Sequence, residues 1–106
     1  MIKITVIRNQ EQHIVEFCVA GHANQGPHGR DIVCAGVSAL TQTAVLGLDR
    51  HLRTKMHLDI ASGNLKMRLL DNPDALTNAV LETMLIGLTE IAEKNPQSVR
   101  ISEHRR

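Results

Sequence analysis

The sequence predicts an α+β fold, a single domain over residues 1–106 with helices packed on one face of a mixed or antiparallel sheet. Three observations carry this prediction. Two segments alternate apolar and polar residues on either side of a break, as β-hairpins do. Each is followed by a segment with apolar residues every three or four positions, as in an amphipathic helix. Finally, 106 residues with 42% hydrophobic side chains suffice for one core and leave no room for a second.

The predicted order is strand-strand-helix-strand-strand-helix-strand. In the first hairpin, Ile2, Ile4 and Val6 alternate with polar neighbours, and residues 9–12 form the break. The alternating apolar positions of its second strand are Val15, Phe17 and Val19. A helix is then expected from Asp31, a suitable N-cap, to about Arg53. Its apolar stripe consists of Val33, Val37, Leu40, Ala44, Leu48 and Leu52.

The second hairpin and helix repeat this plan. Residues 56–60 and 65–69 alternate around a turn at Ser62-Gly63-Asn64. Asn72 is expected to cap the second helix, Pro73 to start it, and Lys94-Asn95-Pro96 to end it. Its broad apolar stripe comprises Leu76, Val80, Leu81, Met84, Leu85, Ile86, Gly87, Leu88 and Ile91. Such width predicts cover by the sheet and by a second copy, hence a homodimer. Residues 99–101 are expected as a short last strand and residues 103–106 as a frayed end.

Charge and aromatic content exclude several functions. A net charge of +1 gives no electrostatic footprint for nucleic acid or anionic lipid. Phe17 is the single aromatic residue, so base-stacking sheets and aromatic cages are excluded. The first residues lack the apolar segment of a secretory signal, and no apolar run approaches the ~18 residues of a bilayer span. We therefore expect a cytoplasmic protein with no membrane or direct nucleic-acid partner, whose Cys18 and Cys34 are thiols.

The segment from Gly21 to Ser38 concentrates the reactive side chains. Cys34 stands three positions after Asp31, in the first helical turn, where free backbone N–H groups and the helix dipole favour a thiolate. His22 is the candidate base that takes the thiol proton. Asp31 and Ser38 share the helix face of Cys34 and are supporting candidates. Asp31 can cap the helix or orient His22, although its charge opposes the thiolate. Ser38 can assist or simply bond back to a helix carbonyl.

Residues 21–30, GHANQGPHGR, are too broken by glycine and proline for a regular element and predict an exposed loop. The residues expected to contact substrate are Gly21, Gly26, Gly29 and Arg30. A zinc site is disfavoured, because Cys18 and His22 on one extended strand stand about 13 Å apart, whereas ligands of one zinc lie within about 4 Å. A phosphate loop is disfavoured because Pro27 stands where lysine is needed. We therefore expect no metal and no cofactor.

Two blocks, Gly21-His22-Ala23 and the helix start DIVCAGVSAL, stand with twelve positions between His22 and Cys34. In these blocks and throughout its length, the chain resembles the bacterial ribosomal-processing cysteine protease family, Prp. The resemblance implies a homodimeric cysteine endopeptidase with a His22–Cys34 dyad. Its implied partner is the N-terminal extension of large-subunit ribosomal protein number twenty-seven, which the family removes. Family members usually have alanine at the position of Gly36, and this difference predicts a looser first helical turn and an altered rate.

Two other functions also fit this sequence. A non-catalytic, ribosome-associated module would use the same groove to hold a peptide tail. A thiol redox sensor would oxidise Cys34 reversibly without hydrolysis. The ionisation of the Cys34 thiol separates these readings, because only the protease needs a thiolate whose formation depends on His22.

Overall fold

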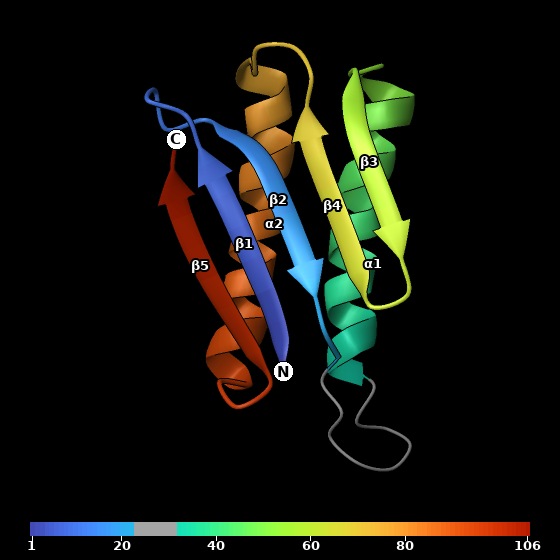
Figure 1. Ribbon diagram of the computed structural model, residues 1–106, viewed down its shortest axis with the longest axis vertical. Helices are drawn as coiled ribbons and strands as arrows, with labels where there is room; N and C mark the ends of the chain where they lie inside the picture. Colours follow the sequence, from blue (N-terminus) through green and yellow to red (C-terminus); the bar gives the residue numbers. More distant parts are fainter. Residues whose placement is uncertain (23–31) are drawn as a thin grey trace.

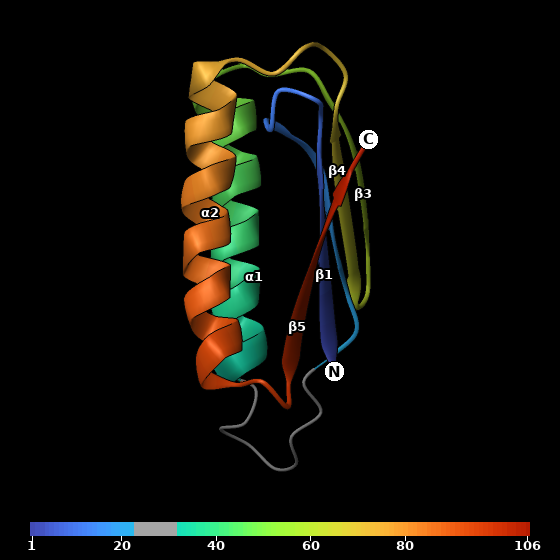
Figure 2. The same cartoon turned by 90° about the vertical axis from the view of Figure 1, so that its left-hand side faces the viewer.

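The computed structural model describes residues 1–22 and 32–106, which form a five-stranded mixed sheet with two helices on one face (Figures 1 and 2). The elements in chain order are β1 (Ile2–Arg8), β2 (Ile14–Ala20), α1 (Ile32–Leu46), a π-helical turn (Gly47–His51), β3 (Met56–Ala61), β4 (Asn64–Leu69), α2 (Ala75–Lys94) and β5 (Val99–Arg105). The predicted α+β class and element order are confirmed.

The strand order is β3-β4-β2-β1-β5, which the local residue patterns do not determine. β1 runs antiparallel to β2 and parallel to β5, while β4 runs antiparallel to both β2 and β3. Alternation places Ile2, Ile4 and Val6 on the helix side, where each is at most 2% exposed. Figure 1 shows α1 behind β3 and β4, and α2 behind the other half of the sheet.

The first hairpin contains a β-bulge that the alternation did not predict. Ile7 pairs with Glu16, but Arg8 pairs with Ile14, so Val15 is an extra residue in β2. The extra residue moves the side chains beyond the bulge to the opposite face of the sheet. Ile14 rather than Val15 is therefore fully buried in the core.

α1 confirms the first predicted helix, which ends in the π-helical turn before Leu52. Val37, Ala44 and Leu48 of the predicted stripe are buried. Thr41 is buried with them, and its hydroxyl donates to the Val37 carbonyl at 2.9 Å. The predicted cap, Asp31, lies outside the described residues, so that role stays a prediction.

α2 begins later than predicted, because Asp74 rather than Asn72 caps it. The Asp74 carboxylate accepts from the Thr77 backbone N–H at 2.9 Å, and the Thr77 hydroxyl accepts from the Asp74 N–H at 3.0 Å. This reciprocal pair is a capping box. Pro73 therefore precedes the cap instead of occupying the first helical position. The predicted end of the helix is correct, since Asn95 is the C-cap.

The apolar positions of α2 divide between two faces. The buried residues are Thr77, Leu81, Met84, Leu85 and Leu88. Leu76 and Ile86, expected within the same stripe, are instead 62% and 66% exposed. Gly87 lies where α2 crosses α1, since a Cβ there would stand 2.8 Å from Leu40 Cδ1. The helix thus has a core face and a separate, partly apolar outer face.

The expectation of a short last strand and a frayed end is wrong. β5 pairs with β1 along its whole length, from Val99 opposite Ile2 to Arg105 opposite Arg8. The Arg106 N–H also donates to the Arg8 carbonyl at 2.8 Å. Residues 103–106 lack an apolar pattern, but pairing with a strand from the other end of the sequence orders them.

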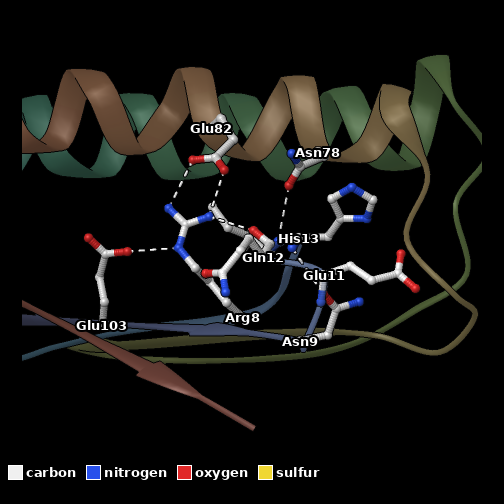
Figure 3. Close-up of polar contacts among 9 residues, drawn as sticks. Arg8, Asn9, Glu11, Gln12, His13, Asn78, Glu82 and Glu103 are labelled. Atoms are coloured by element: carbon white, nitrogen blue, oxygen red, sulfur yellow. Dashed lines mark hydrogen bonds and ion pairs between the residues drawn. The ribbon is translucent and has the colours of Figure 1, made fainter.

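Arg8 connects three elements on the helix side of the sheet (Figure 3). Its guanidinium donates to both carboxylate oxygens of Glu82 on α2, at 2.6 and 3.0 Å, and to Glu103 on β5 at 2.8 Å. A further bond reaches the Gln12 carbonyl at 2.8 Å. The hydrogen bond from Arg8 holds the pKa of Glu82 below its ordinary value.

Ile32–His51 and Ala75–Lys94 have the length and composition of membrane spans, contrary to the expectation from continuous apolar runs. Core helices of soluble proteins meet the same criteria. Both segments here supply core residues beneath the sheet, Leu48 from the first and Leu81 and Leu88 from the second, each at 0% exposure. Packing beneath the sheet therefore accounts for the buried part of their apolar content.

Candidate active site

A cavity of about 600 Å³ lies between α1 and the β3–β4 hairpin. His22, Cys34 and Ser38 line it near the start of α1, and Asp49 lines it where the helical segment ends. Between these two ends, the cavity is lined by aliphatic side chains from α1 and from the β3–β4 hairpin; they include Val37, Val45, Leu46, Met56, Leu58 and Ile60. The structure thus brings the two predicted catalytic residues to one end of an apolar groove.

Cys34 is the third residue of α1, as predicted, and it is half-buried against the core. The backbone N–H groups of a first helical turn have no partners within the helix, and together with the dipole they favour a negative charge there. A carbonyl attacked by Cys34 would therefore develop its oxyanion beside backbone N–H groups that can stabilise it. Gly36 faces α2 rather than the cavity, since a Cβ on it would lie 3.3 Å from Ile91 Cδ1.

The backbone around His22 is fixed from two sides. The Gly21 N–H donates to the Gly63 carbonyl at 2.9 Å, and the Met1 nitrogen donates to the His22 carbonyl at 2.6 Å. Gly21 has φ +93°, and a Cβ on it would collide with the Met1 carbonyl oxygen. Only glycine fits here, so Gly21, predicted as a substrate-loop residue, has a clear structural role beside the cavity that it lines.

Of the residues predicted to support the dyad or contact substrate, the structure describes Ser38 but not Asp31, Gly26, Gly29 or Arg30. Ser38 is exposed and lines the cavity on the same side of α1 as Cys34, which agrees with the predicted shared face. Asp31, Gly26, Gly29 and Arg30 lie outside the described residues, and their predicted roles stay predictions.

Gly63 is a residue that the sequence reasoning missed. It was interpreted only as part of a turn, yet it lines the cavity and contacts the His22 imidazole. The proximity depends on strand order, because β4 must lie beside β2 for the β3–β4 turn to meet the end of β2. The one signal in the sequence was the glycine itself, because a turn that requires a positive φ favours glycine; the structure gives Gly63 a φ of +71°.

Cys18 is in a different environment from Cys34. It pairs with Thr5 and Lys66 on the sheet face opposite the helices, and its Sγ lies 3.9 Å from the Asn64 side-chain oxygen. Burial raises the pKa of the Cys18 thiol. Within residues 1–22 and 32–106, no group of three metal-ligating side chains is placed to hold an ion.

A helix-borne cysteine and a strand-end histidine that line one largely apolar cavity match the arrangement of a cysteine protease. A family model described as "Cysteine protease Prp" matches residues 1–100. The ribosomal processing cysteine protease Prp of Staphylococcus aureus is 31% identical over 105 residues, covering 96% of this chain and 98% of that protein.

Two solved structures of the S. aureus protease show the same fold. One is a complex with a covalently linked product peptide, with a TM-score of 0.90, 28% identity, and coverage of 97% of this chain and 99% of that one. The other is a complex with a substrate peptide, with a TM-score of 0.87, 27% identity and the same coverage. The chain belongs to the Prp family of ribosomal processing proteases and is a cysteine endopeptidase, which confirms the resemblance seen in its sequence.

Proposed function

We propose that this enzyme removes the N-terminal extension of large-subunit ribosomal protein number twenty-seven with a dyad of Cys34 and His22. The single observation that carries the dyad is that both side chains line the same end of one cavity. The relatives' names support ribosomal processing, and the S. aureus enzyme has been solved with substrate and with a covalently linked product.

The chemistry of the dyad follows from the two side chains. His22 takes the proton of the Cys34 thiol, and the sulfur attacks the scissile carbonyl carbon. Backbone N–H groups at the start of α1 stabilise the oxyanion that forms. The C–N bond then breaks as His22 gives its proton to the leaving amine, leaving a thioester on Cys34. Water, deprotonated by His22, attacks the thioester and releases the acid and the thiol.

The groove suits an extended apolar segment of the substrate. Cys34 and Asp49 are separated by fifteen positions, or about 22 Å of helix, which corresponds to about six or seven residues of extended peptide. Aliphatic side chains line this path, and Leu58 and Ile60 expose apolar surface there. In the described part of the chain, β3 pairs on one edge alone, so its free edge can hydrogen-bond a peptide backbone.

The test is mass spectrometry of the ribosomal protein, extension intact, after incubation with the enzyme. We expect one defined cut by the wild type and by Cys18→Ala, and none by Cys34→Ala or His22→Ala. Retention of the peptide by the wild type and all three variants, without a cut, would favour the binding module. Reversible oxidation of Cys34 without hydrolysis would favour the redox sensor.

We also propose that the enzyme is a homodimer that acts in the cytoplasm. Leu76 and Ile86 give the outer face of α2 exposed apolar surface that a second copy can cover. Light scattering should report twice the chain mass for the wild type and a smaller mass for Ile86→Lys; a monomeric wild type at high concentration would refute the dimer. Cell fractionation tests the location, where a reducing environment keeps Cys34 reactive.

A further inference from the structure

The β3–β4 turn brings Gly63 into direct contact with the imidazole of His22. A Cβ on Gly63 would lie 2.6 Å from Nε2, 3.1 Å from Cε1 and 3.4 Å from Cδ2. Contacts of a Cβ below 3.0 Å are essentially absent from proteins, because they lie far inside van der Waals separation. The ring therefore occupies the space that any side chain at position 63 would need.

The same glycine also holds the backbone next to His22. Its carbonyl accepts from the Gly21 N–H at 2.9 Å, and its φ of +71° lies in the left-handed region that favours glycine. One residue thus fixes the segment that carries the histidine and borders the ring at its end. These two contacts link the β3–β4 hairpin, which forms one wall of the groove, to the end of β2.

We propose that Gly63 is a positioning residue for the His22 imidazole, and that a side chain there displaces the ring from the place where it serves Cys34. This inference rests on the proposed dyad. The ring ends a side chain that is free to rotate, whereas the Gly63 backbone is bonded into a turn, so the ring is the part that moves. Restoring an ordinary contact of 3.4 Å requires a shift of about 0.8 Å.

A shift of this size matters for catalysis more than for folding. Misplacing a reacting group by about 1 Å costs about 100-fold in rate. We therefore expect Gly63→Ala to lower kcat about 100-fold with a smaller change in KM, because the aliphatic side chains that line the rest of the groove are unaltered. The pH profile of Cys34 alkylation should move toward that of His22→Ala.

The experiment measures iodoacetamide alkylation of Cys34 against pH, in a Cys18→Ala background, for Gly63→Ala and Gly63→Asn. Asparagine tolerates positive φ, so Gly63→Asn keeps the steric conflict with the ring while reducing backbone strain. The matched control is Gly47→Ala, whose new Cβ has nothing within 4 Å. Circular dichroism selects the variants that fold, and Gly47→Ala should match the wild type in alkylation and in kcat.

The outcomes separate this inference from the proposed function. If His22→Ala leaves the alkylation profile unchanged, the dyad is wrong. If His22→Ala changes the profile while folded Gly63→Asn keeps the wild-type profile and kcat, the positioning role of Gly63 is overturned. A double variant adds a check: Gly63→Ala should cause no further loss in a His22→Ala background, and a full additional loss would contradict the inference.

Discussion

Replacing Gly36 by alanine should stabilise this enzyme without changing its activity. Gly36 lies inside α1, and its missing Cβ points at Ile91 of α2 rather than into the cavity. The sequence predicted that glycine here loosens the first turn and alters the rate. The observed geometry instead places its effect in the packing of the two helices.

The expected change in the free energy of unfolding is the gain in helix propensity less the cost of fitting a new methyl group. Alanine gains about 1 kcal/mol over glycine inside a helix, because glycine loses more backbone entropy on folding. The new Cβ would lie 3.3 Å from Ile91 Cδ1, so this terminal methyl must give way by a few tenths of an ångström, which the end of a flexible side chain can do. The gain in helix propensity is therefore retained, and we expect an increase of about 1 kcal/mol in the free energy of unfolding, or roughly 4 °C in Tm.

Gly87→Ala is the matched comparison, because it makes the same chemical change in the facing helix. Its Cβ would stand 2.8 Å from Leu40 Cδ1, a conflict that requires a shift of about 0.6 Å. Overpacking of this kind costs about 1–3 kcal/mol and outweighs the helix propensity. We expect a net loss of about 1 kcal/mol, opposite in sign to Gly36→Ala.

The assay is urea unfolding followed by far-ultraviolet circular dichroism, with kcat/KM measured on each folded variant. The midpoint should rise for Gly36→Ala and fall for Gly87→Ala at constant m-value. Equal shifts in both variants would refute the reasoning from available space. A change in kcat/KM for Gly36→Ala at unchanged stability would instead restore the predicted effect on rate.

Three further predictions concern charge, capping and thiol reactivity. Arg8→Met should lower the free energy of unfolding by about 2 kcal/mol in urea titrations, since it removes charge-assisted bonds. Because the pKa of Glu82 is lowered in the fold, its stabilising effect is complete above the ordinary glutamate pKa and is lost as pH falls through the folded-state pKa; Glu82→Gln should flatten that acid dependence. Asp74→Ala should cost about 1 kcal/mol by thermal unfolding, and Asp74→Asn much less, since asparagine also caps. At neutral pH, iodoacetamide should alkylate Cys34 well before Cys18, whose raised pKa keeps it protonated; mass spectrometry showing Cys18 modified first would contradict this.

Local patterns predicted most of the elements because their signals are contained within a few residues. Alternation identified Ile2, Ile4 and Val6 as core residues, and helical periodicity identified Val37 and Leu48. Features that depend on a partner were missed. The bulge at Val15 appears only once β1 and β2 are aligned, and the ordered end of β5 requires β1 beside it.

In the candidate site, too, local features could be predicted from the sequence and features that depend on a distant partner could not. Cys34 and His22 could be selected from chemistry and helix geometry, because each carries a reactive group at an element boundary. Gly63 has no reactive group, and its role depends on three strands being placed in order. The capping role of Asp74 was within reach of the sequence, but the proline before it favoured a start at Asn72.

The parallel pairing of β1 with β5 also bears on how the molecule folds and opens. Arg8 and Glu103 are 95 positions apart, so this edge closes only after a long loop is brought together, which slows folding. The groove is lined by α1 and by residues of β1, β2, β3 and β4, and no described residue of β5 lines it. Hydrogen exchange should therefore detect opening at the edge strand β5 while the amides of the inner strands β2 and β4 remain protected. An enzyme built this way can loosen its last strand and still hold its substrate.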